Sequence, residues 1–318
     1  MARNRVQFQK GLSEAAFDEA YGTEEQCHAA LVAWRWPDGF ECPDCRGRKH
    51  CVVRRGTRRL FQCNACRKQT SVRAGTIFAS SKLPLRLWFK TIYQITQSKA
   101  GISSLELARR LGVTQTAAWM MKHKLGQVML ERNASKRLTG KVQMDDAYIG
   151  GAHSGRRGRG AEGKTPFVAA VATTDDGKPD QIILRRVKAF SKVAIRNLSS
   201  TAILAGAEVA SDGLACFQAV TEAGCAHVAI KTGSGPKAAK TPAFKWVNTV
   251  LGNMKAALVG TYRAVQEKHV SRYLAEFEYR FNRRYDLKAM IPRLAFVALH
   301  GHARQAAGGI GNIGIGEG

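Results

Sequence analysis

The apolar positions of the chain recur with two different spacings, and the spacing changes along the sequence. Helical spacing predicts helices over most of residues 1–38 and over 83–132, and again over 242–260 and 265–285. Between about residues 140 and 232, short strand-like runs alternate with loops and helices. These runs are KVQMDDAYIGG, PFVAAVATT, QIILRRV, AEVASDG and HVAIKT. The alternation predicts a mixed α/β domain in this part of the chain.

Segments rich in glycine or basic residues separate and follow these regions. SGRRGRGAEGK (154–164) and KTGSGPKAAK (231–240) are predicted loops, and we expect the final GHARQAAGGIGNIGIGEG to be mobile. The expected fold is a multi-domain α+β chain in four parts. They are 1–75, with a helix and a cysteine-rich module; 76–135, helical; 136–290, α/β; and 291–318, a Gly-rich tail.

The excess of basic residues indicates what the chain binds. Its 318 residues include 50 Lys and Arg against 24 Asp and Glu, which gives a net charge of +26. Such an excess favours nucleic acid, because binding releases counterions from the phosphates. An anionic membrane surface is the alternative, but no basic amphipathic segment suits it better than DNA. We expect the loop at 154–164 to contact DNA rather than to be a solvated basic turn.

The sequence also predicts where the protein resides. No apolar run reaches the roughly 18 residues of a membrane span, and the start MARNRVQFQK lacks the apolar segment of a secretory signal. We therefore expect a cytoplasmic protein associated with the bacterial nucleoid, in which thiols stay reduced. Its eight cysteines are then expected to be metal ligands or core residues rather than disulfides.

Two C-x-x-C pairs indicate a metal site near the amino terminus. CPDC supplies Cys42 and Cys45, and CNAC supplies Cys63 and Cys66 after 17 intervening residues. This spacing is typical of a zinc ribbon, in which four thiolates close a structural Zn²⁺ site. His50 and Cys51 lie between the pairs and are alternative ligands. Ten Lys or Arg but a single acidic residue lie between Cys42 and residue 73, which predicts that the ribbon contacts DNA.

Residues 103–129 predict two helices joined by a tight turn at Gly112, with Thr114 as the N-cap of the second helix. This pattern is typical of a helix-turn-helix whose second helix enters the major groove. A purely structural helical hairpin is the alternative. The predicted DNA-contacting residues of the second helix are Gln115, Thr116, Trp119 and Lys122.

Two aspartates in predicted strands indicate a second metal site. Asp145 lies in KVQMDDAYIGG and Asp212 ends AEVASDG, and paired strands bring such residues within about 5 Å of each other. Two carboxylates this close require a cation, and Mg²⁺ suits oxygen ligands and two-metal phosphodiester chemistry. On a later helix, Asn248 offers a neutral third ligand, and Lys255, on the same face, can hold a phosphate. Rival third ligands are Glu276 and Glu278.

With these motifs in place, nearly the whole chain resembles the insertion-sequence transposases with an amino-terminal zinc ribbon and an ISXO-like transposase domain. RWPDGFECPDC and CNAC resemble the family's ribbon, DDAYIGG and SDG its first two catalytic motifs, and YLAEFEYRFNRR its carboxy-terminal helix. The family belongs to the transposases and integrases with the ribonuclease H fold. The resemblance therefore implies an RNase H-like catalytic domain with a mixed sheet.

The resemblance also implies roles for single residues. The catalytic positions fall on Asp145, Asp212 and Asn248, followed by Lys255, which is the Asp-Asp-Asn-Lys variant; Asp146 replaces the usual Glu and is accessory. The implied activity is Mg²⁺- or Mn²⁺-dependent cleavage at the terminal inverted repeats of an insertion sequence and strand transfer to target DNA. The implied assembly is a homo-oligomer, a dimer, on double-stranded DNA.

Two other classes of protein remain open from the sequence. A DNA-binding regulator derived from a transposase would keep the ribbon and the helix-turn-helix without cutting DNA, and Asn248 is the one catalytic position that hints at it. A tyrosine or serine recombinase would need a nucleophile beside arginines. YRFNRRY is the nearest candidate for such a site, but its spacing fits an amphipathic helix better.

Overall fold

The computed structural model describes residues 11–56, 58–150, 163–231, 241–262 and 265–300. Most of both basic loops and the final 18 residues lie outside this range, and with them the predicted DNA contact of the loop at 154–164 and the predicted mobility of the tail. Contacts divide the chain into two compact units. Of the described residues, the sheet unit holds 98–103 and 129–285, and the ribbon unit holds 11–97, 104–128 and 286–300.

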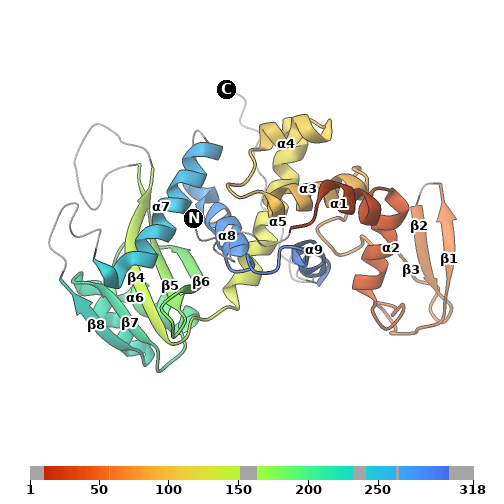
Figure 1. The fold of residues 1–318 in the computed structure, drawn as a ribbon. Helices are drawn as coiled ribbons and strands as arrows, with labels where there is room; N and C mark the ends of the chain where they lie inside the picture. The colour runs from red at the N-terminus through yellow and green to blue at the C-terminus, as the bar shows by residue number, and fades with distance from the viewer. Residues whose placement is uncertain (1–10, 57, 151–162, 232–240, 263–264, 301–318) are drawn as a thin grey trace. The chain divides into compact units, whose positions relative to one another are not determined.

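The sheet unit contains one mixed five-stranded sheet. Its strands are β4 Lys141–Ile149, β5 Thr165–Thr173, β6 Pro179–Arg186, β7 Glu208–Asp212 and β8 Ala226–Ile230. Their order is β6-β5-β4-β7-β8; β4, β5 and β6 pair antiparallel, whereas β7 runs parallel to β4 and to β8 (Figure 1). Each strand-like run of the sequence forms one of these strands, so the predicted mixed α/β region is confirmed.

Helices cover both faces of this sheet. The α-helix α6 (Lys192–Ala202) and the 3-10 helix η2 (Ala215–Ala223) pack on one face, and α7 (Lys245–Thr261) and α8 (Val270–Phe281) pack on the other. Met144 of β4 lies in the core with α6, whereas Ala147 lies in the core with α7 and α8. Because side chains alternate along a strand, Asp145 is on the face that α7 covers.

Side chains of α8 close the outer edge of β6. The side chain of Asn282, the C-cap of α8, accepts from the N–H of Ile182 at 2.8 Å and donates to its carbonyl at 2.9 Å. Glu278 accepts from the N–H of Leu184 at 3.0 Å. Glu278 and Asn282 are four residues apart, about 6 Å along the helix axis, and their partners Leu184 and Ile182 are two residues apart, about 6.6 Å along the strand. The two spacings match, so both side chains can reach the strand at once. These side chains therefore satisfy backbone groups of Ile182 and Leu184 that would otherwise be unpaired at the β6 edge of the sheet.

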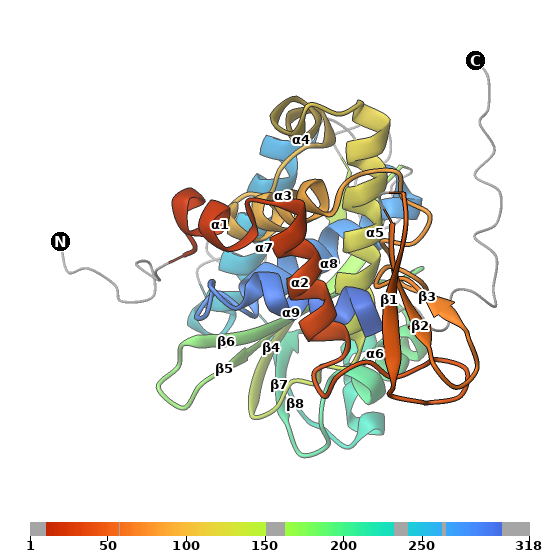
Figure 2. The same ribbon diagram turned by 90° about the vertical axis from the view of Figure 1, so that its right-hand side faces the viewer.

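The ribbon unit combines helices with a small antiparallel sheet in the order β1-β2-β3 (Figure 2). Its core at the ribbon is formed by Phe40, Cys42, Phe61 and Cys63, with Val32 and Trp36 packed against them. The elements of the unit are α1 Glu14–Tyr21, α2 Glu24–Arg35, β1 His50–Arg55, β2 Arg58–Cys63, β3 Gln69–Thr70, α3 Leu85–Gln97, α4 Ser104–Leu111, the first part of α5 Gln115–Ala134, and α9 Met290–His300. So small an apolar core leaves the ribbon dependent on another source of stability.

Side-chain caps determine where the first helices of this unit begin. Thr23 and Gln26 form a capping box at the start of α2. The carboxylate of Glu24, in the first turn of α2, accepts from the N–H groups of Leu85 and Arg86 at 2.9 and 3.0 Å. Glu24 therefore caps α3 from a different helix, where its negative charge also suits the helix dipole.

The predicted pair of helices at 103–129 is present as α4 and α5. Gly112 takes a positive φ of 66° at the turn, a conformation that favours glycine. The Thr114 hydroxyl accepts from the N–H of Ala117 at 3.2 Å, which is an N-cap. The helical hairpin is thus confirmed as local structure, while its role in DNA recognition stays a prediction.

The last described helix corrects the predicted boundary of the tail. Residues 290–300 form α9, which packs against α2 and α3, whereas we expected a tail from residue 291. Its buried residues are Met290, Ile291, Leu294, Ala295, Ala298 and Leu299. This is an apolar stripe with helical spacing, which the Gly-rich composition of the following residues obscured. No helix in the described part of the chain is long and apolar enough to cross a membrane.

Candidate metal centres

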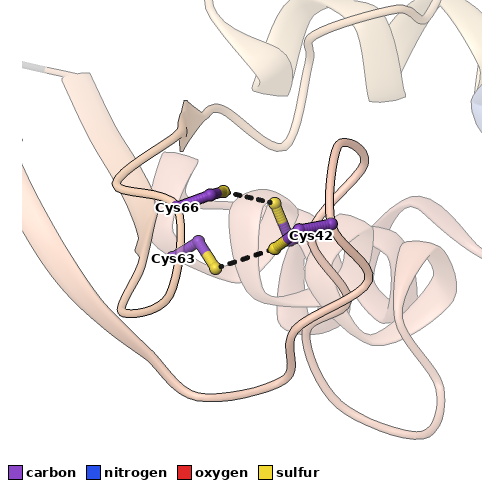
Figure 3. Close-up of side chains that lie close together, drawn as sticks. Cys42, Cys63 and Cys66 are labelled. Carbon is purple, nitrogen blue, oxygen red and sulfur yellow. Dashed lines mark hydrogen bonds between the residues drawn. The ribbon is translucent and has the colours of Figure 1, made fainter.

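The four predicted cysteines meet in the ribbon. Their sulfur atoms all lie within 4.8 Å of one another, with 3.5 Å between Cys42 and Cys66 and between Cys45 and Cys63 (Figure 3). A tetrahedral Zn²⁺ with Zn–S bonds of 2.3 Å places its sulfurs about 3.8 Å apart. The arrangement therefore fits a closed four-thiolate site.

The two knuckles that carry these cysteines have the same backbone form. Arg46 and Arg67, each directly after the second cysteine of its pair, take positive φ values of 59° and 62°. Their N–H groups donate to the carbonyls of Cys42 and Cys63 at 2.9 and 3.0 Å. A Cβ on Gly47 would lie 3.3 Å from the Cys63 sulfur, so glycine allows the close approach there.

The backbone of the knuckles also favours thiolates. The N–H of Cys66 donates to the Cys63 sulfur and is the main cause that lowers the pKa of Cys63 to about 7. The N–H of Cys45 lowers the pKa of Cys42 in the same way. Because zinc binds the thiolate, these two shifts favour the metal-binding form of Cys42 and Cys63. Hydrogen bonds with the other three sulfurs raise the pKa of Cys66 to about 12, so the shared protons gather on that thiol when no metal is bound.

The remaining cysteines and His50 lie outside this group of ligand atoms. The His50 ring packs against Phe40 and Phe61, with centroids 4.7 and 5.4 Å away, and Cys51 is exposed on β1. Neither belongs to a metal-binding group among the described residues. The cysteines predicted to be core residues are buried, and they are Cys27, Cys216 and Cys225.

A second cluster of ligand atoms lies where β4 and β7 run side by side. Met144 pairs with Ser211 in the parallel register, which brings the next residues, Asp145 and Asp212, to the same level. One carboxylate oxygen from each of Asp145, Asp146 and Asp212 lies within 4.8 Å of the others. The sequence predicted that Asp145 and Asp212 lie close together. It did not predict that Asp146 joins them, because neighbouring side chains of a strand point to opposite faces.

Electrostatics in this cluster disfavours three bare carboxylates. Burial, followed by the charges of Asp146 and Asp212, raises the pKa of Asp145 to about 7. Two smaller effects lower this pKa: the N–H of Asp146 donates to the Asp145 carboxylate at 2.8 Å, and the positive charge of Lys255 favours the ionised form. Like charges at this distance favour either a bound proton or a bound cation. The donor set therefore fits a divalent cation with oxygen ligands.

α7 carries the other two residues predicted for this site. Asn248 is half-buried in its first turn, and Lys255, exposed and seven residues later, lies on the same face of the helix. Lys255 is close enough for its charge to lower the pKa of Asp145. The structure thus places Lys255 beside the carboxylates and Asn248 on the helix that covers their face of the sheet.

The rival third ligands have other partners. Glu278 forms an ion pair with Arg185 at 2.6 Å and caps the edge of β6, and burial raises its pKa against the opposing effect of Arg185. Glu276 forms an ion pair with Arg280 at 2.6 Å. Neither belongs to the carboxylate cluster among the described residues. Both carboxylates therefore serve the packing of α8.

The predicted DNA-contacting residues differ in exposure. Gln115 and Thr116 are exposed at the start of α5, and Trp119 is half-buried, with its ring stacked on His123 at 3.9 Å. Lys122 is only 3% exposed. A phosphate contact requires an exposed ammonium group. Lys122 therefore lacks the exposure that its predicted DNA contact requires.

Comparison with known proteins assigns both regions. Residues 22–69 match the transposase zinc-ribbon domain, and residues 137–282 match the ISXO2-like transposase domain. The first match contains the cysteine group and the second contains the carboxylate cluster, so the molecule is a transposase by family. The chain belongs to the insertion-sequence transposases that join a zinc ribbon to an ISXO2-like transposase domain.

Two individual proteins were also found to be similar. An uncharacterized protein in transposable element ISH50 of Halobacterium salinarum is 27% identical over 225 residues, which is 64% of this chain and 72% of that protein. A pre-cleavage Mos1 transpososome has 9% identity and a TM-score of 0.26, over 68% of this chain and 79% of that one. A TM-score this low supports no conclusion about the fold.

Proposed function

We propose that the protein is an active DNA transposase that cuts DNA at the terminal inverted repeats of an insertion sequence and joins the freed end to target DNA. The observation that carries this proposal is the cluster of Asp145, Asp146 and Asp212, whose oxygens lie within 4.8 Å of one another on adjacent strands. The catalytic domain is RNase H-like. The mixed sheet with helices on both faces supports that assignment.

The proposed chemistry assigns a role to each site residue. Asp145, Asp212 and Asn248 would hold a divalent cation, Mg²⁺ or Mn²⁺, which supplies an activated water and offsets charge on the phosphodiester. Asp145 must be ionised to bind the cation. Lys255 contacts a DNA phosphate, as its exposure and its proximity to the cluster allow. This is the Asp-Asp-Asn-Lys variant of the site.

DNA binding is assigned to the ribbon unit. Zn²⁺ on the four cysteines holds the ribbon, and its β-hairpin presents two directly opposite arginine pairs, Arg54 with Arg59 and Arg55 with Arg58. Among the described residues none of these arginines forms an ion pair, and like charges opposite each other destabilise a hairpin. Phosphates of the double helix relieve this repulsion.

The α4–α5 hairpin is the second DNA-binding element, a helix-turn-helix. Gln115 and Thr116 are exposed at the amino-terminal end of α5, where recognition helices contact bases. Two copies of the chain on two element ends would form the working assembly, a dimer on DNA.

A regulator without nuclease activity is the second candidate, because Asn248 is neutral where a third carboxylate would strengthen the cation site. A tyrosine recombinase is not supported. Tyr279, in the YRFNRRY segment, is fully buried in α8, and the Arg283 guanidinium lies over its ring at 3.6 Å. Such a phenol cannot reach a DNA strand. The second tyrosine of the segment, Tyr285, is exposed, but its hydroxyl donates to the carbonyl of Pro179 at the start of β6 at 3.3 Å, which gives it a structural partner.

Strand cleavage tests the proposal. The substrate is a labelled duplex that carries one terminal inverted repeat of the insertion sequence, here called the element end. It is incubated with the native protein, with Asp145→Ala and with Asp175→Ala, each with and without Mg²⁺. Asp175 is an acidic residue in the exposed β5–β6 turn and serves as the matched control. We expect Mg²⁺-dependent nicking by the native protein and the control but not by Asp145→Ala. Specific binding without nicking by the native protein would support the regulator instead.

A further inference from the structure

The first turn of α7 is capped by a residue from another element. Phe244, its N-cap residue, makes no side-chain cap hydrogen bond. Instead, the side-chain oxygen of Gln143, on β4, accepts from the N–H groups of Trp246 and Val247 at 2.9 and 3.1 Å. These are two of the four N–H groups that a helix start leaves without a partner inside the helix. The cap therefore joins α7 directly to the central strand of the sheet.

The same strand carries the first catalytic position. Gln143 and Asp145 are two residues apart on β4, so their side chains lie on the same face of the sheet. A second hydrogen bond holds the same turn, because the Trp246 indole donates to the carbonyl of Gly177, between β5 and β6, at 2.6 Å. The start of α7 is thus fixed at two points, one of them two residues from Asp145 on the same face of β4.

What α7 carries makes this fixation relevant to the site. Asn248 follows Trp246 by two residues, and Lys255 lies about 10 Å further along the helix on the same face. A shift or a rotation of the first turn therefore displaces both residues relative to Asp145. The Gln143 amide supplies the accepting oxygen without a charge, whereas a carboxylate here would add to the repulsion among the three nearby acidic groups.

We infer that Gln143 is a positioning residue for the cation site, because it fixes the first turn of α7 and with it Asn248 and Lys255 against Asp145. The inference rests on the proposed function for the identity of the site. It does not make Gln143 a ligand. Its side-chain oxygen is already occupied by the two N–H groups of α7.

Hydrogen exchange tests the structural step without any cation. In Gln143→Ala, the amides of Trp246 and Val247 lose their acceptor, and we expect faster exchange in the first turn of α7. Gln218→Ala, at an exposed position of η2 in the same unit, is the matched control and should leave this turn unchanged. Unchanged exchange in Gln143→Ala would overturn the cap and the inference with it.

Mn²⁺ affinity of the zinc-loaded protein tests the functional step. We expect Gln143→Ala to weaken Mn²⁺ binding about tenfold, as residues that orient ligands commonly do, and to have no such effect in the Asn248→Ala background. Unchanged affinity, or an equal loss in both backgrounds, would show that Gln143 does not act through Asn248. A native protein whose Mn²⁺ binding does not depend on Asp145 would overturn the proposed function itself, and the positioning role with it.

Discussion

The Asp145 carboxyl lies where burial and neighbouring charges disfavour its ionised form. Its pKa of about 7, raised by burial and then by Asp146 and Asp212, compares with 3.8 for a free aspartate. The folded state therefore holds this proton more tightly than the unfolded chain. The contribution of the protonated Asp145 to the free energy of unfolding is fully present below about pH 4 and is lost as the pH rises through 7. The loss is on the order of 4 kcal/mol.

Asp145→Asn should remove this pH dependence. Without divalent cations, we expect the variant to exceed the native protein in free energy of unfolding at pH 8 by a few kcal/mol, and to differ little from it near pH 4. Urea unfolding at the two pH values measures the difference. Asp175→Asn, in the exposed turn, should follow the native curve. An equal fall in stability between pH 4 and pH 8 in Asp145→Asn and in the native protein would contradict the assigned environment.

Single functional residues can be predicted from the sequence where they have a distinctive spacing. Residues whose role depends on a contact with a distant segment cannot. C-x-x-C pairs and aspartates in strand-like runs are visible in one dimension. The place of Asp146 is not, because strand alternation puts neighbouring side chains on opposite faces. Gln143 gives no signal at all, since its role depends on a helix that begins 102 residues later.

Among the elements, α8 shows how a helix can complete a sheet. Asn282 replaces the hydrogen bonds of a missing neighbouring strand at Ile182. Asn282→Ala leaves both backbone groups of Ile182 without this partner, and we expect a loss of about 1–3 kcal/mol in the free energy of unfolding. Asn197→Ala, on the exposed face of α6, is the control and should change little. If both variants unfold alike, the edge contact does not contribute to stability.

We expect the ribbon to depend on bound Zn²⁺, because its apolar core is so small. Cys63→Ser should lose the zinc and weaken binding to the element end, while the sheet unit keeps its fold. Cys51→Ser, on the same hairpin but outside the sulfur group, is the matched control and should keep one zinc per chain. Zinc analysis and gel shifts measure both properties. Unchanged zinc content and DNA affinity in Cys63→Ser would exclude the ribbon from DNA binding.

Over the whole molecule, the order of elements follows from the sequence but their association does not. Each predicted strand and most helices are present near their predicted bounds. However, residues 286–300 belong to the ribbon unit, together with residues from the start of the chain. Hydrophobic spacing describes which face an element buries and contains no information on which distant element covers it.

If Asp145 and Asp212 bind the cation that supports DNA cleavage, a change of ligand at Asp212 should change which cation supports the reaction. In Asp212→Cys a soft sulfur replaces an oxygen, which disfavours Mg²⁺ and tolerates softer ions such as Mn²⁺. We predict that cleavage of the element end by this variant is lost with Mg²⁺ and partly restored with Mn²⁺. Cleavage by Asp212→Cys at the native rate with Mg²⁺ would show that Asp212 does not bind the catalytic cation.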